Sequence, residues 1–177
     1  MQDDIILEEE AIADERAAEA ARLGAAILHQ PIRVLVTLRP AVCVGPTTSV
    51  RAAIEQMNQH SAGCVLVEEK GQLTGIFTER DVLTKVVGGG LDLDRMTVGA
   101  VMTHNPESLS PDDRVSHALN KMSVGGFRHI PVVDDDGHPV GVVSMRNVVD
   151  YMVDLFRTEI LNLPPEPRKV SRAREGA

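Results

Sequence analysis

The sequence predicts an α/β (α+β) fold in which one β-α-β-β-α unit occurs twice. The segment Gly75–Asp81 (GIFTERD) returns 66 residues later as Gly141–Asn147 (GVVSMRN), and each copy reads as a strand that runs into a helix. Upstream, Pro46–Val50 matches Pro111–Val115 at an offset of 65 residues. A fixed period of this kind is the signature of an internal repeat. The one-residue difference falls in an acidic turn between the two matches.

The elements of each unit follow from local patterns. Short apolar stretches at 41–44 and 107–109 predict a weak first strand. Ser49 and Asp113 are candidate helix caps, because their side-chain oxygens can accept hydrogen bonds from free backbone amides. The helices that follow carry apolar residues at near-helical spacing, namely Val50, Ile54 and Met57 in one unit and Val115, Leu119 and Met122 in the other. Two apolar strands joined by an acidic turn (64–67 and 73–77; 130–133 and 140–143) and a second helix (82–87; 148–155) complete each unit.

A single unit is small for an independent core, since domains below roughly 60 residues are marginal. We therefore expect the two units to pack sheet against sheet as one module. The predicted organisation is an acidic N-terminal helical arm at 1–38, units at 39–87 and 105–156, a linker at 88–104, and a Pro-rich, then basic tail at 157–177.

Composition narrows the class of protein. Hydrophobic residues make up 43% of the 177, aromatic residues only 2%, and there is no Trp, so aliphatic side chains must form the core. No apolar run approaches the ~18 residues of a membrane span, and no secretory signal is visible at the N-terminus. Cys43 and Cys64 lie in apolar, strand-like settings, which is typical of free buried thiols in a reducing cytoplasm.

The charge of −8 is concentrated at the N-terminus. Residues 1–20 carry eight carboxylates against one arginine, so they account for −7 of the total and disfavour nucleic-acid phosphates at that end. The Ala-rich stretch 8–28 favours a helix, which could pack on its own module or serve as a partner or dimer helix. The tail has the composition of a disordered segment, and its few basic residues do not favour a nucleic-acid role.

The repeated box carries a hydroxyl and a carboxylate, Thr78 and Asp81, three positions apart at a strand-to-helix junction. A carboxylate such as Asp81 can accept both hydrogen bonds of a sugar diol, and the Thr78 hydroxyl can accept or donate. The alternative is that the two side chains only cap the helix.

A second feature is Arg128-His129, which stands directly before the apolar strand Ile130-Pro131-Val132. Adjacent cations suit phosphate oxygens, and arginine offers a forked contact. The alternative is an exposed arginine beside a structural histidine. The corresponding positions of the first unit are Gly63 and Cys64, which offer no cation.

Together, the tandem units, the GIFTERD box and the RHIPV strand resemble paired CBS domains (cystathionine-β-synthase type), the Bateman module, over residues 39–156. The resemblance implies two units related by a pseudo-twofold axis, with clefts between them that bind adenosine-containing ligands such as AMP, ADP, ATP, NAD or S-adenosylmethionine. It also implies a homodimer.

Carried over to this sequence, the resemblance predicts one strong cleft and one weaker cleft. In the first, Asp81 and Thr78 would hold the ribose, Arg128 and His129 would face the phosphates, and apolar residues would enclose the adenine (Val42, Ile76, Ile130 and Pro131). In the second, Ser144 and Asn147 would meet Gly63 and Cys64, with no cation pair opposite. Asn147 is uncharged, so we expect a phosphorylated nucleotide to prefer the first cleft.

Other chemistry finds little support in the sequence. The six histidines and two cysteines show no zinc spacing, Asp134–Gly137 lacks the Glu of a calcium loop and predicts a hairpin turn, and Gly88–Gly90 lacks the Lys-Ser/Thr of a phosphate loop. No nucleophile has a recognisable activating partner.

We therefore expect a cytoplasmic, non-catalytic sensor that needs no metal or cofactor. It would bind an adenine nucleotide between its units and act on an unidentified regulated protein. The alternative is a structural or oligomerisation scaffold without a ligand.

Overall fold

The computed structural model describes residues 15, 18, 21–22, 24–36 and 41–155. Most of the predicted acidic arm and all of the predicted tail at 157–177 lie outside the described residues. Residues 24–28 are helical, and Ile27 on this helix is buried. None of the helices in the described part of the chain is long and apolar enough to cross a membrane.

The first unit contains a four-stranded sheet in the order β1-β2-β3-β4. Its elements are β1 (Cys43–Val44), α3 (Val50–Gln59), β2 (Cys64–Glu69), β3 (Gln72–Thr78), α4 (Glu79–Asp81) and the π-helix η1 (Val82–Val87). β1 runs parallel to β2, whereas β3 is antiparallel to both of its neighbours. The fourth strand, β4 (Thr103–His104), follows α5 (Val98–Val101) in the segment predicted as a linker.

The second unit repeats this plan with a smaller sheet. It consists of α6 (Val115–Gly125), β5 (His129–Val133), β6 (Pro139–Ser144) and α7 (Met145–Leu155), and β5 and β6 are antiparallel. The strand predicted at 107–109 is reduced to a single parallel bridge between Leu109 and Val132, the counterpart of the β1–β2 pairing. Both hairpins shift register at equivalent points, after Val67 and after Val132.

Equivalent helices bury equivalent residues. Val50, Ala53 and Met57 are the buried residues of α3, and the residues 65 positions later, Val115, Ala118 and Met122, are those of α6. The predicted Ser49 cap is present, because its side chain accepts a hydrogen bond from the Ala52 amide at 3.2 Å. The predicted Asp113 cap is wrong. Arg114 occupies the N-cap position without a side-chain bond to the helix backbone, and the Asp113 carboxylate instead accepts from the Ser110 amide at 2.8 Å.

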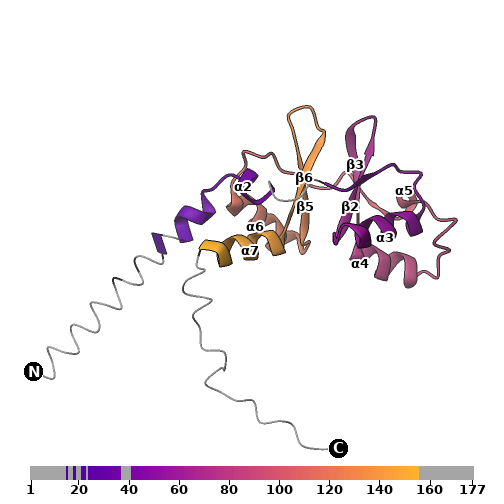
Figure 1. Cartoon of the computed structure of the whole chain (residues 1–177), viewed down its shortest axis with the longest axis horizontal. Coiled ribbons are helices and arrows are strands. Elements are labelled where there is room, and N and C mark those ends of the chain that lie inside the picture. The colour runs from indigo at the N-terminus through magenta and orange to yellow at the C-terminus, as the bar shows by residue number, and fades with distance from the viewer. Residues whose placement is uncertain (1–14, 16–17, 19–20, 23, 37–40, 156–177) are drawn as a thin grey trace, which may run out of the picture.

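The two sheets meet in the middle of the molecule and the helices cover their outer sides (Figure 1). Each unit has its own apolar core, and a third cluster joins them, in which Val142 of β6 packs against residues of β2 and β3 such as Leu66 and Ile76. The predicted α+β fold of two units packed sheet to sheet is thereby confirmed.

A short segment before each unit completes the other unit. Helix α2 (Arg33–Val36) packs on β6 and α7 of the second unit, and α5 packs on β3 of the first. The backbone contacts match: Ile32 N donates to Asp113 O at 2.7 Å, and Val98 N donates to Thr48 O at 2.8 Å. Residues 30–36 and 96–102 are thus a further pair of equivalent segments, which the sequence pattern did not reveal.

The glycine that opens each box allows the crossing segment to pack closely against it. A Cβ atom on Gly75 would overlap the Met102 side chain that follows α5, and a Cβ atom on Gly141 would overlap the Val36 side chain of α2. Neither glycine has a positive φ. It is therefore the close approach of a neighbouring side chain, and not backbone conformation, that requires glycine at both positions.

Candidate ligand site

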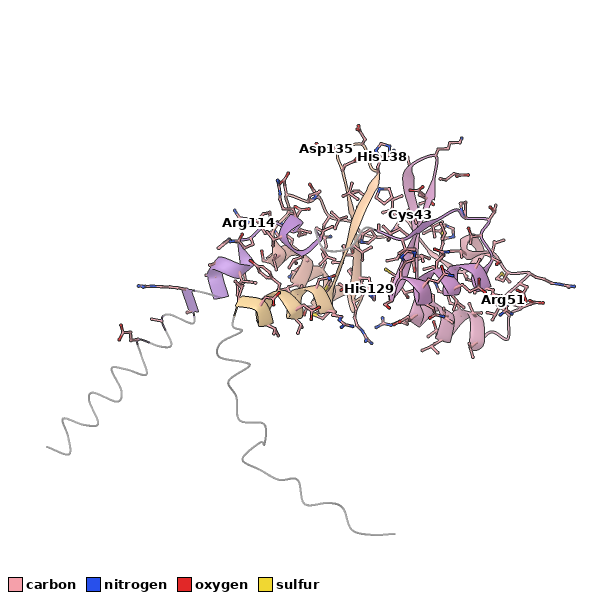
Figure 2. All side chains as sticks on the ribbon, in the orientation of Figure 1. Cys43, Arg51, Arg114, His129, Asp135 and His138 are labelled. Atoms are coloured by element: carbon pink, nitrogen blue, oxygen red, sulfur yellow. The ribbon has the colours of Figure 1, made fainter. Side chains whose placement is uncertain are left out.

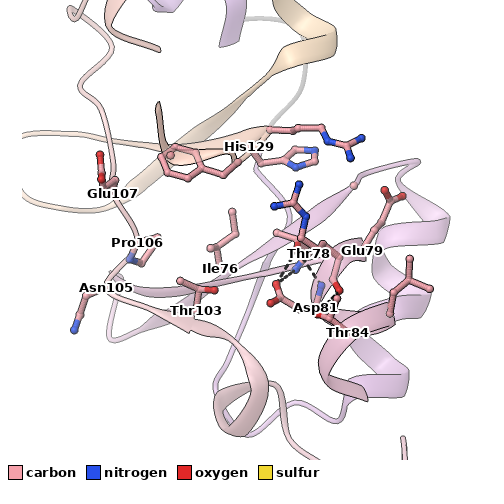
Figure 3. A pocket seen from close by; sticks show the side chains of 16 residues that line it. Ile76, Thr78, Glu79, Asp81, Thr84, Thr103, Asn105, Pro106, Glu107 and His129 are labelled. Carbon is pink, nitrogen blue, oxygen red and sulfur yellow. Dashed lines mark hydrogen bonds between the residues drawn. The ribbon is translucent and has the colours of Figure 1, made fainter. Parts of the chain in front are cut away.

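Two cavities of similar size lie between the units, of about 670 Å³ and 640 Å³. The first is lined by the box of the first unit, by β4 with the residues after it, and by the residues that lead into β5. In Figure 3, Thr78 and Asp81 lie on one side of this cavity and His129 on the other. The second cavity is lined by the box of the second unit, by α2 and by residues 61–64.

The structure gathers most of the predicted residues in these two places. Ile76, Thr78, Asp81, Arg128 and His129 all line the first cavity. The four residues predicted for the second cleft, Gly63, Cys64, Ser144 and Asn147, all line the second cavity.

Three predicted adenine-enclosing residues lie elsewhere. Val42 lines the second cavity and not the first. Ile130 and Pro131 line neither. Ile130 is fully buried in the core of the second unit, and Pro131 is buried where β5 pairs with β6.

Thr78 and Asp81 form a capping box at the start of α4. Asp81 Oδ2 accepts from the Thr78 amide at 2.9 Å and from the Thr78 hydroxyl at 2.7 Å, and Thr78 Oγ1 accepts from the Asp81 amide at 3.3 Å. Asp81 is only 7% exposed, and its other oxygen, Oδ1, lies 2.7 Å from Lys85 Nζ. The capping alternative is therefore present, and Oδ1 is the oxygen that keeps capacity to accept a further bond.

Ser144 and Asn147 make the same contacts in the second unit. Asn147 Oδ1 accepts from the Ser144 amide at 2.9 Å and from its hydroxyl at 2.6 Å. Tyr151 occupies the position equivalent to Lys85, so the pair has no ammonium beside it. The amide nitrogen of Asn147 can only donate a hydrogen bond.

Arg128 and His129 line both cavities. The prediction that no cation pair faces the second cleft overlooked Arg128, and Arg146 lines that cavity as well. The two residues stand where the chain enters β5, between the units, as the position of His129 in Figure 2 shows. The sequence position of Arg128 and His129 in the second repeat did not indicate that both residues would line both clefts.

Burial of His129 disfavours its charged form, which weakens the predicted cation pair. Burial lowers its pKa below 6.5, Arg128 lowers it further, and Glu79 opposes both effects only in part. The ring packs over Gly63, where an added Cβ atom would stand 2.7 Å from Nε2. The glycine of the first unit thus makes room for the histidine of the second.

Several lining residues were missed in the sequence. Thr103, Asn105, Pro106 and Glu107 come from the end of the predicted linker and the start of the second unit, which carry no motif. Glu79 and Arg80 occupy the variable positions of the box, and Arg80 donates to the Gly126 carbonyl of the other unit at 2.9 Å.

The turn at Asp134–Gly137 brings together Asp134, Asp136 and His138, whose ligand atoms lie within 4.8 Å of one another. These groups already bond within the turn: Asp134 Oδ1 accepts from the amides of Asp136 at 3.0 Å and of His138 at 2.8 Å. The hydrogen bond from the His138 amide is the main reason why the pKa of Asp134 lies below its usual value. Gly137 has a φ of 83°, as the predicted hairpin turn requires.

A family model described as "CBS domain" matches residues 34–88 and 98–154. The chain belongs to the CBS domain family. The first match begins within α2 and the second begins with α5, the two short segments that cross to the other unit.

Among curated relatives, a protein of Methanopyrus kandleri described as uncharacterized is 30% identical over 135 residues, which are 74% of this chain and 69% of that protein. The meiotically up-regulated gene 70 protein of Schizosaccharomyces pombe is 39% identical over 102 residues, 58% of this chain. The match covers 14% of that protein's length, and 20% of an Arabidopsis thaliana CBS domain-containing protein, so this chain spans a small part of those relatives.

Solved structures share the fold. A CBS-domain containing protein from Agrobacterium tumefaciens is 31% identical with a TM-score of 0.63, covering 70% of this chain and 99% of that one. A CBS domain protein from Pyrobaculum aerophilum, complexed with AMP, is 25% identical with a TM-score of 0.65, covering 74% of this chain and 99% of that one.

Proposed function

We propose that this CBS pair is a non-catalytic regulatory module that binds an adenine nucleotide in the first cavity. The observation that carries the proposal is the convergence of Thr78 and Asp81 of one unit with Arg128 of the other on one cavity of about 670 Å³. Pockets for small ligands typically measure about 300–1,000 Å³. The Pyrobaculum relative with AMP supports an adenosine ligand.

In this proposal the box holds the ribose. Asp81 Oδ1 accepts a hydroxyl of the diol beside Lys85, while Oδ2 keeps its two bonds to Thr78. The Thr78 hydroxyl donates its only proton to Asp81, so it contributes to ligand binding as an acceptor or by positioning the carboxylate.

The charges of the cavity favour a single phosphate. Asp81 and Glu107 are each paired with a lysine, Lys85 and Lys121. The remaining charged lining residues are Glu79, Arg80 and Arg128, which leave one positive charge in excess. AMP matches this excess better than ADP or ATP, because each added phosphate brings negative charge with no further cation to meet it.

Regulation would follow from the position of the ligand between the two units. A ligand that contacts both can favour one relative arrangement only if it binds that arrangement more tightly. An unidentified protein would bind one arrangement of the units in preference to the other. The free thiols Cys43 and Cys64 fit a reducing compartment such as the cytoplasm.

The test is a thermal-shift and calorimetric screen of the full chain with AMP, ADP, ATP, NAD and S-adenosylmethionine. At 100 times its Kd a true ligand stabilises the folded state by about 2.7 kcal/mol. We expect AMP to give the largest shift at equal concentration. The absence of a shift with all five would reject nucleotide binding and favour the scaffold function.

The scaffold alternative rests on an observation of its own. Leu83 and Val87 of η1 and Val149, Met152 and Leu155 of α7 are exposed, with Leu83 at 67%. Exposed apolar side chains on a helix of each unit are consistent with a protein interface, which supports the expected homodimer. Light scattering after size exclusion tests this: Val87→Glu with Met152→Glu, two positions that line neither cavity, should give a monomer that still binds AMP.

A further inference from the structure

The two cavities share one wall. Gly63, Glu79, Arg128 and His129 belong to the lining of both. The His129 ring rests on Gly63, and the Glu79 carboxylate lies within 3.6 Å of the place where a Cβ atom of that glycine would stand. A charged group in this wall therefore acts on both cavities at once.

The three arginines of the cavities differ in their partners. Arg80 lines only the first cavity and donates to the Gly126 carbonyl. Arg146, its counterpart 66 residues later, lines only the second cavity and lies 3.6 Å from Asp150. The Arg128 guanidinium has no hydrogen-bond or ion-pair partner among the described residues, and it alone of the three lines both cavities.

We propose that Arg128 is a single phosphate-binding group shared by two nucleoside sites, so that an anionic ligand in one cavity weakens the binding of an anionic ligand in the other. The proposal rests on the proposed function. One guanidinium forms its forked, charge-assisted contact with one phosphate at a time. A second phosphate meets a neutral His129 and the Glu79 carboxylate in the same wall. Adenosine has no phosphate for Arg128 to bind, so two adenosine molecules should occupy the two cavities independently.

Because coupling between sites is reciprocal, either cavity should show the same effect. Calorimetry of the full chain with adenosine and with AMP measures it. Thr103→Trp obstructs only the first cavity and Met145→Trp only the second, and both positions are exposed. These variants give the affinity of each site alone. In the wild-type chain, we expect the second AMP to bind about tenfold more weakly than the same site does alone, and adenosine to show less than a twofold difference.

Arginine variants locate the effect. Arg128→Gln should weaken AMP binding at both isolated sites and abolish the tenfold coupling, with adenosine affinity unchanged. The matched controls Arg80→Gln and Arg146→Gln should each weaken AMP at one site only and leave the coupling in place.

Three outcomes would overturn the proposal. They are AMP steps equal to the isolated affinities, a loss at only one site in Arg128→Gln, and adenosine binding to only one cavity. Binding of neither adenosine nor AMP to the wild-type chain is a separate result, since it rejects the proposed function itself.

Discussion

The two boxes of this CBS pair have the same local geometry and different chemistry. Asp81 and Asn147 each accept two hydrogen bonds from the hydroxyl residue three positions earlier, with nearly equal distances. Only Asp81 carries a charge, and only Asp81 has a lysine at the following turn. The hydrogen bonds that both boxes make stabilise the start of a helix. The charge and the lysine that only Asp81 has are not needed for this capping and are available for ligand binding.

This difference separates capping from function. Asn147 shows that an amide oxygen satisfies the cap, so the cap alone does not need the negative charge of Asp81. A buried carboxylate is costly to desolvate unless it is paired, and Lys85 supplies that pair. The charge of Asp81 thus exceeds what the fold requires, which supports its proposed role at the ribose.

The largest expected effect tests whether the two cores are equivalent. Met57→Ala and Met122→Ala each remove a buried side chain from the same position of α3 and α6. Each should lower the free energy of unfolding by about 2–5 kcal/mol, measured by urea denaturation. The two losses in free energy of unfolding should be similar. A much larger loss in one variant would show that its core cannot collapse into the space left by the methionine, whereas the other core can.

The next effect concerns the carboxylate. Asp81→Ala should weaken AMP binding by on the order of 1.5–3 kcal/mol, the value of a hydrogen bond to a charged group. Asp81→Asn keeps the cap, as Asn147 demonstrates, and should still lose about tenfold in affinity, or ~1.4 kcal/mol. Calorimetry measures both. An Asp81→Ala chain that binds AMP as tightly as the wild type would contradict the assignment.

A smaller effect distinguishes the first helices of the units. Ser49 caps α3 through its side chain, whereas Arg114 at the same position of α6 makes no such bond. Ser49→Ala should cost about 1 kcal/mol of stability, and Arg114→Ala less than about 0.5 kcal/mol, as expected for an exposed surface site. Equal losses in urea midpoints would show that the Ser49 bond contributes nothing.

The smallest effect is a pH slope from His129. Its pKa in the folded chain lies below 6.5, so the unfolded chain takes up this proton first as the pH falls. The free energy of unfolding therefore carries no penalty from His129 above pH 6.5. It declines as the pH falls below 6.5, because protonation of this side chain favours the unfolded chain. His129→Gln should flatten the slope of unfolding free energy between about pH 5 and 7. An unchanged slope in His129→Gln would contradict a buried neutral imidazole.

The sequence was sufficient for the parts of the fold with a strong period. The hairpins, the helices α3, α6 and α7, and the two boxes follow from alternation, helical spacing and the 65–66-residue repeat. The segments α2, α5 and β4 were missed, because helices of four residues and a strand of two leave no periodic signal. Their structure depends on tertiary contact with the opposite unit.

The candidate site was likewise predictable only where a local sequence motif marks its residues. Thr78 and Asp81 were predicted from their positions in the box and Arg128 from its residue type before β5, and all three line the first cavity. The sharing of Arg128 and the lowered pKa of His129 were not predicted, because both depend on how the units are placed and on burial, which no local pattern encodes.

The crossing of residues 30–36 onto the second unit has a kinetic consequence. Ile32 and Leu35 complete the core of a unit whose helix α6 begins about 80 residues later in the chain. Such long sequence separations raise contact order and slow folding. The second unit cannot close its core until the first chain segment has docked, so the two repeats should unfold in one cooperative transition. A fragment that begins after residue 36 would leave the second unit with an open core.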